Sequence, residues 1–199
     1  MIYISHRINT ILELKEVPIE YGIEIDLRDF GSDLILEHEP FLGGEKFENF
    51  IKYYNHKFII LNIKSERIEF KIKEILNKYN IENYFFLDSS FPMIYTLSNG
   101  GEKNIAIRFS EYESIESVLK MKNKVVWVWI DSFENFSLNI ENYTKLKENN
   151  FKICVVSPEL QKQPEKLKLY RNYIYDNNII PDMICTKIYN INKWKEKFK

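Results

Sequence analysis

The stretch Glu24–Pro40, EIDLRDFGSDLILEHEP, places charged side chains in a sequence that otherwise has the apolar pattern of β-strands. Alternate residues of a β-strand share one face, so Glu24, Asp26 and Arg28 would all point the same way. If that face met solvent, the charges would need no special explanation. If it pointed into a closed barrel, burying the charges would be costly, and a ligand or metal ion would be the expected reason for them.

Segments of the β type recur along the whole chain. The expected strands span residues 2–5, 22–28 with an extension over 33–38, 57–64, 83–89, 104–110, 124–131, 151–157 and 182–187. Between them, apolar residues three and four positions apart predict helices over 44–54, 66–79 and 138–150. Ser114 and Pro158 stand where helix starts are favoured.

Eight strands that alternate with helices predict an α/β fold, a compact (β/α)₈ TIM barrel that occupies residues 1–199 as a single domain. The chain of 199 residues is short for this fold, which typically takes about 250. A doubly wound open sheet is the alternative. That fold usually carries a glycine-rich phosphate loop after its first strand, whereas the segment SHRINTI (5–11) has no glycine.

Charge and cysteine content restrict the class of protein. The chain has 28 basic and 29 acidic residues, a balance that gives no general attraction for nucleic acid. Cys154 and Cys185 lie in apolar strand-like runs, which favours buried thiols in a reducing cytoplasm over a disulfide scaffold. No apolar run has the length of a membrane span, and the first residues do not resemble a signal peptide. The abundance of Ile, Lys and Asn suggests a bacterial source with an AT-rich genome.

In a TIM barrel the working side chains stand at the carboxyl ends of the strands, and the first three expected strands end in polar residues. These are His6, Arg7, Glu24, Asp26, His38, Asn62 and Lys64. The oxygen atoms of Glu24, Asp26 and Asn62 suit a hard cation such as Mg²⁺ or Ca²⁺. Basic side chains at the same rim suit phosphate oxygens, and two histidines suit general acid and general base catalysis.

These residues resemble the pattern of the glycerophosphodiester phosphodiesterase family, within the phospholipase C-like phosphodiesterases. The matching segments are HR (6–7), EIDLRDFGSDLILEHE (24–39) and NIK (62–64). The resemblance implies the same barrel, a place in lipid metabolism, and metal-dependent cleavage of a small soluble phosphodiester. It also implies that His6 and His38 are the acid–base pair, that Glu24, Asp26 and Asn62 hold the cation, and that Arg7 and Lys64 hold phosphate.

Later segments add weaker similarity. SSFP (89–92) resembles the family's Ser-Phe element, and WVWID (127–131) resembles a strand that would bring Trp129 to the pocket wall. Arg108 and Lys187, at or near strand ends, are further candidates for the substrate pocket. His56 precedes the third strand, at the opposite end of the barrel, and is expected to be structural.

Three departures from the family pattern stand out. Ile8 occupies the position of the glycine in His-Arg-Gly, and Asn62 replaces the third acidic ligand, which lowers the charge of the site. The lobe usually inserted before the Glu-x-Lys strand is reduced to PFLGGEKFENFIKYYNHKF (40–58), enough for one loop and one helix. The glycerol specificity of the family is therefore not carried over.

Two other functions stay open. A divergent barrel could bind a phosphorylated sugar, glycerol or nucleotide without turnover, or the enzyme could act on a nucleotide-activated precursor of a surface polysaccharide. The sequence does not decide the cation, the assignment of acid and base, hydrolysis against formation of a cyclic phosphate, or the oligomeric state.

Overall fold

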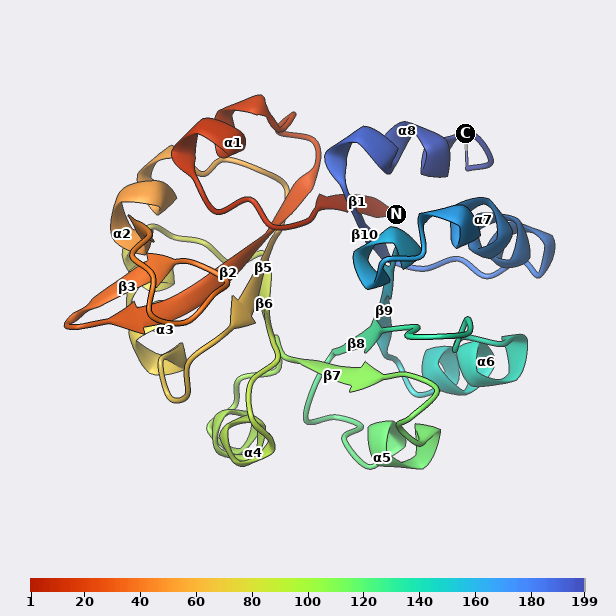
Figure 1. The fold of residues 1–199 in the computed structure, drawn as a ribbon. Coiled ribbons are helices and arrows are strands. Elements are labelled where there is room, and N and C mark those ends of the chain that lie inside the picture. The colour runs from red at the N-terminus through yellow and green to blue at the C-terminus, as the bar shows by residue number, and fades with distance from the viewer. Residues whose placement is uncertain (199) are drawn as a thin grey trace.

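The computed structural model describes residues 1–198, which form a barrel of eight parallel strands with helices around it (Figure 1). The barrel strands are β1 (Ile2–Ser5), β2 (Gly22–Phe30), β5 (Ile59–Ile63), β6 (Tyr84–Leu87), β7 (Ala106–Phe109), β8 (Trp127–Ile130), β9 (Lys152–Val156) and β10 (Met183–Thr186). The last strand pairs with the first, with Met183 opposite Ile2. The predicted TIM barrel is confirmed, and each of its strands lies within an expected segment or overlaps it.

The ring of strands is weakest between β6 and β7. Within residues 1–198, these two strands are joined by a single parallel bridge, Phe86 opposite Ile105, and the Phe86 N–H donates to the Asn104 carbonyl at 2.9 Å. Neighbouring pairs such as β7 and β8 share a continuous four-residue ladder. The barrel is therefore least tightly closed at this seam.

The extension expected over 33–38 proved to be a separate strand, β3 (Asp33–Leu36), which runs antiparallel to β2. Gly31 takes the left-handed conformation, with φ of 60°, and lets the chain reverse there. Leu36 thereby returns to a position opposite Leu27, and the Glu37 N–H donates to the Asp26 carbonyl at 3.1 Å. This hairpin brings His38 back to the mouth of the barrel.

The helix expected over 44–54 is also shorter than predicted. Its first residues form β4 (Glu45–Lys46), which pairs with β3, and only α2 (Phe47–Phe50) and a 3₁₀ turn over Ile51–Tyr53 follow. The segment between β3 and β5 therefore holds no lobe among the described residues. Pro158 likewise begins a 3₁₀ turn, Pro158–Gln161, in place of an α-helix.

The remaining helices are α1 (Ile11–Glu16), α3 (Glu69–Lys78), α4 (Phe91–Asn99), α5 (Ile115–Leu119), α6 (Ile140–Glu148), α7 (Leu167–Asp176) and α8 (Ile191–Lys195), and two further 3₁₀ turns cover Pro164–Lys166 and Ile188–Asn190. Of these helices, α3 and α6 lie within the expected segments 66–79 and 138–150, and α5 begins directly after Ser114. Ser114 caps α5 by accepting the Ser117 N–H, as its position predicted. None of the helices in residues 1–198 has the length and apolar character needed to cross a membrane.

The burial pattern answers the question that the charged strand raised. Ile23, Ile25 and Leu27 of β2 belong to the core between strands and helices, so Glu24 and Asp26, which alternate with them, point into the barrel. The apolar interior consists of side chains such as Ile4, Ile60, Phe85, Trp127, Cys154 and Cys185, and the two cysteines are free, buried thiols. The charged face of β2 is therefore the interior face.

Candidate active site

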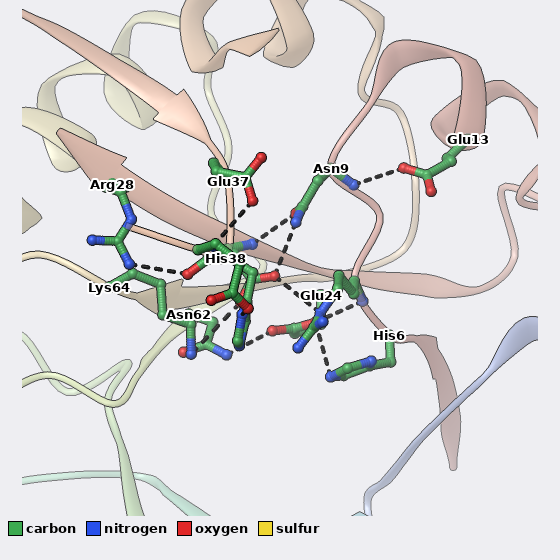
Figure 2. A network of polar contacts seen from close by, with 12 residues as sticks. His6, Asn9, Glu13, Glu24, Arg28, Glu37, His38, Asn62 and Lys64 are labelled. Atoms are coloured by element: carbon green, nitrogen blue, oxygen red, sulfur yellow. Dashed lines mark hydrogen bonds and ion pairs between the residues drawn. The ribbon is translucent and has the colours of Figure 1, made fainter. Parts of the chain in front are cut away.

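Glu24 lies at the floor of the barrel mouth and is fully buried. Its Oε1 accepts a hydrogen bond from Asn62 Nδ2 at 2.8 Å, and its Oε2 accepts the backbone N–H of Arg7 at 2.7 Å (Figure 2). Burial raises the pKa of the Glu24 carboxyl, although both hydrogen bonds act in the opposite direction. Keeping this carboxylate ionised is therefore costly in the free protein.

Asp26 stands one layer higher on the same face of β2. Asn9 holds it in a reciprocal pair, in which Asn9 Nδ2 donates to Asp26 Oδ2 and the Asp26 N–H donates to Asn9 Oδ1, each at 2.9 Å. Arg7 Nε lies 3.4 Å from Oδ2, and Lys64 Nζ lies 3.6 Å from Oδ1. Burial and the neighbouring charge of Glu24 raise the pKa of Asp26 in spite of these partners.

The backbone at Arg7 is unusual. Arg7 has φ of 58°, a left-handed conformation that residues other than glycine rarely adopt and that is concentrated at functional sites. This conformation directs the Arg7 N–H to Glu24, while Ile8 turns into the core and its N–H donates to the Glu24 carbonyl at 2.8 Å. An isoleucine in place of the family's glycine is thus accommodated, because the left-handed residue is Arg7.

His6 lies partly buried at the edge of this network, with 16% of its side chain exposed. Its Nε2 lies 3.7 Å from Glu24 Oε2, and its Nδ1 has no hydrogen-bond partner within residues 1–198. Burial, followed by the charges of Lys187 and Arg7, lowers the pKa of His6 to about 3. His6 is therefore a neutral imidazole near pH 7.

His38 has a different environment. It follows β3, about a third of its side chain is exposed, and its Nδ1 lies 2.7 Å from Glu39 Oε1. A carboxylate at Nδ1 orients the ring and leaves Nε2 for another partner. The same hydrogen bond lowers the pKa of Glu39. The His6 side chain is thus the more shielded of the two, with 16% exposed against 34% for His38.

A cleft of about 210 Å³ opens beside side chains that contact Glu24 and Asp26, although these two carboxylates do not themselves line it. Most of the predicted site residues line it: His6, Arg7, His38, Asn62, Lys64, Arg108 and Trp129. Lys187 is not among the lining residues, although its charge acts on His6. His56 lies apart from them, buried with its Nε2 2.9 Å from the Val17 carbonyl, as its position ahead of β5 predicted.

The opposite wall of the cleft contains Asp131 and Gln161, which the sequence did not single out, and Asp88, whose position at a strand end suits either a pocket residue or a turn. The Arg108 guanidinium forms ion pairs with both Asp88 and Asp131, and Gln161 Nε2 donates to Asp131 Oδ1 at 2.7 Å. Asp88 Oδ2 also lies 3.7 Å from Lys64 Nζ, which links the two walls. Asp88 and Asp131 directly follow β6 and β8, so their strand-end positions were the available signal. Asn9 lies in the loop after β1, so its position near a strand end was a weaker signal of the same kind.

The oxygen atoms at the floor fit a hard cation. Asn62 Oδ1 is buried and has no hydrogen-bond partner in the described part of the chain, and two buried carboxylates lie beside it. Carboxylate and amide oxygens are the ligands that Mg²⁺ and Ca²⁺ take, with water completing the shell. Within residues 1–198, however, no group of three or more His, Cys, Asp or Glu side chains is placed to hold a metal ion. A cation bound here would therefore have two carboxylates and one amide as its protein ligands.

Comparison with known proteins places the fold. No protein-family model and no curated protein matches the sequence. Among solved structures, the chain is similar to a TIM-barrel enzyme, the glycerophosphodiester phosphodiesterase from Agrobacterium tumefaciens strain C58. The TM-score is 0.66, the alignment covers 93% of this chain and 96% of that one, and the sequences are 12% identical. At this identity the similarity establishes the fold.

Proposed function

We propose that the protein is a metal-dependent phosphodiesterase that cleaves a small glycerophosphodiester-like substrate. The observation that carries the proposal is that two histidines and two basic side chains line one cleft, and that residues of this lining contact two buried carboxylates. The similarity in fold to a solved glycerophosphodiester phosphodiesterase supports the same reaction class.

Each side chain has a separate part in the proposed reaction. Arg7 and Lys64 bind the phosphate oxygens and neutralise negative charge that grows on them. His6, which is neutral, accepts the proton of the nucleophile, either water or a neighbouring hydroxyl of the substrate. His38, held by Glu39, donates a proton to the departing alkoxide oxygen. A neighbouring hydroxyl as nucleophile would give a cyclic phosphate, and water would give a monoester.

The cation would be held by Glu24, Asp26 and Asn62. Bound there, Mg²⁺ or Ca²⁺ supplies positive charge to a phosphate oxygen. The protein keeps its ligands in place through the Arg7 N–H on Glu24 and through Asn9 on Asp26.

A panel of phosphodiesters assayed with and without EDTA tests the proposal, with products identified by phosphorus NMR. We expect cleavage of at least one glycerophosphodiester, its loss in EDTA, and its recovery when excess Mg²⁺ or Ca²⁺ is added. Absence of cleavage across the panel, together with absence of cation binding in calorimetry, would contradict the proposal. That result would favour the non-catalytic barrel that binds a phosphorylated ligand.

A further inference from the structure

A second hollow lies beside the candidate cleft. This groove, of about 710 Å³, runs between the start of α4 and the segment that joins β7 to α5, at the seam where β6 and β7 share only one bridge within residues 1–198. Leu87, Asp88 and Arg108 line both the groove and the cleft. The two hollows therefore adjoin each other, and the Asp88–Arg108 ion pair stands at their common border.

Apolar side chains line about half of the groove, and the rest of its lining is polar: Asp88, Ser89, Arg108, Glu113, Ser114 and Ser117. Ile94 and Ile107 form its inner surface, and Phe91 and Tyr112 stand at its edges with 62% and 69% of their surface exposed. Exposed apolar surface that adjoins a polar cleft is a common mark of a binding groove. The proposed reaction centre gives these side chains no role, since they lie beyond the two histidines and the basic residues.

A buried hydroxyl marks the end of the groove next to the cleft. Ser89 lines the groove and is 8% exposed, and its Oγ has no hydrogen-bond partner among residues 1–198. A buried polar atom without a partner is costly, and native proteins rarely retain one unless water or a ligand satisfies it. Ser89 directly follows Asp88, which lines both hollows, so it belongs to the part of the groove next to the cleft.

We propose that the groove binds one alcohol group of the substrate and that this alcohol carries a hydrocarbon chain. The oxygen-bearing end would meet Ser89, and the chain would lie along Ile94 and Ile107 between Phe91 and Tyr112. This inference rests on the proposed function for the position of the phosphate. It adds a substrate class, single-chain amphiphilic phosphodiesters, that the cleft alone does not specify.

Binding without turnover tests the groove. Calorimetry with ethyl, butyl, hexyl and octyl phosphate, all below their micellar concentrations, is expected to show Kd falling by up to about fourfold for each added methylene that the groove buries. The variants Phe91→Ser and Tyr112→Ser should flatten this dependence. Phe70→Ser, which replaces an exposed aromatic residue of α3, should not. Equal affinity for the four phosphates in the unaltered protein would overturn the proposal.

Cleavage assays distinguish failure of the groove proposal from failure of the proposed phosphodiesterase reaction. Ethyl and octyl diesters of glycerol phosphate should differ in KM in the same direction. A chain-length dependence of binding with neither diester cleaved would support the groove and contradict the phosphodiesterase. Cleavage of both diesters with equal KM would support the phosphodiesterase and contradict the groove. Absence of both binding and cleavage would contradict the groove and the phosphodiesterase alike.

Ser89→Ala gives a readout that a purely structural role would not produce. The hydroxyl has no partner within the described chain, so its removal should leave the midpoint of urea unfolding unchanged or raise it. KM for the octyl diester should nevertheless rise by about threefold to tenfold, the range expected for one lost hydrogen bond. A lowered unfolding midpoint, or an unchanged KM, would overturn the assigned role of Ser89.

Discussion

Replacing either His6 or His38 with alanine is expected to lower kcat for the cleaved diester by about 10³-fold to 10⁴-fold while the protein remains folded. Each imidazole moves one proton in the proposed reaction, so loss of either one leaves a step without its acid or base. His6 has no hydrogen-bond partner at Nδ1 within residues 1–198, and His38 is partly exposed, so neither truncation should unfold the barrel. Rates measured by phosphorus NMR, with circular dichroism as the check on folding, give the comparison.

The double variant sharpens this prediction. Because the two histidines act in one reaction, removing both should cost little more than removing one, within about tenfold. His56→Gln is the matched control, since it replaces the third histidine of the chain, which lies ahead of β5 and away from the cleft. Turnover close to that of the unaltered protein in both single variants would contradict the assignment.

Lys64→Met is expected to lower kcat by about 10²-fold to 10³-fold, the usual cost of removing one group that stabilises charge in the transition state. Lys64 is 18% exposed, and its Nζ lies between the carboxylates of Asp26 and Asp88, at 3.6 and 3.7 Å. Its charge faces the cleft in which negative charge would grow on phosphate oxygens. Separate measurement of kcat and KM shows whether the charge stabilises the bound substrate or the transition state.

Two further variants test whether the charge of Lys64 causes the effect. Lys64→Arg retains the charge and should recover part of kcat, whereas Lys73→Met removes a lysine of α3 that is ion-paired with Glu102 and should leave kcat unchanged. A rise in KM with unchanged kcat in Lys64→Met would mean that the lysine binds substrate and transition state equally. That outcome would contradict its role in catalysis.

The barrel was predictable because its strands carry a strong local signal. Apolar residues alternate or run continuously through each strand, and the polar pair Glu24 and Asp26 keeps the same alternation on the interior face. The hairpin of β2 and β3 was not predicted, although Gly31 marks a turn. The apolar pattern resumes at Leu34 after the reversal, so the direction of the chain depends on the pairing of Leu36 with Leu27.

The candidate site was predictable where a residue ends a strand and less so where it acts across the barrel. His6 and Lys64 follow from position alone, because parallel strands end at a common rim. His38 reaches that rim by a different route, through the antiparallel hairpin of β2 and β3. The contacts of Asn9 with Asp26 and of Gln161 with Asp131 join residues 17 and 30 positions apart. Such pairs depend on how loops and 3₁₀ turns fold over the rim, and no periodic pattern encodes that.

The central claim is that the ends of the first strands bring both histidines to one phosphate-binding cleft. The chain has three histidines, so two-bond ¹H–¹⁵N NMR spectra of the imidazoles, titrated with glycerol phosphate, test it directly. The account predicts that His6 and His38 shift with the same Kd and that His56, hydrogen-bonded to Val17 at the far end of the barrel, stays unchanged. Shifts confined to one histidine, different Kd values for His6 and His38, or no shift at either would contradict it.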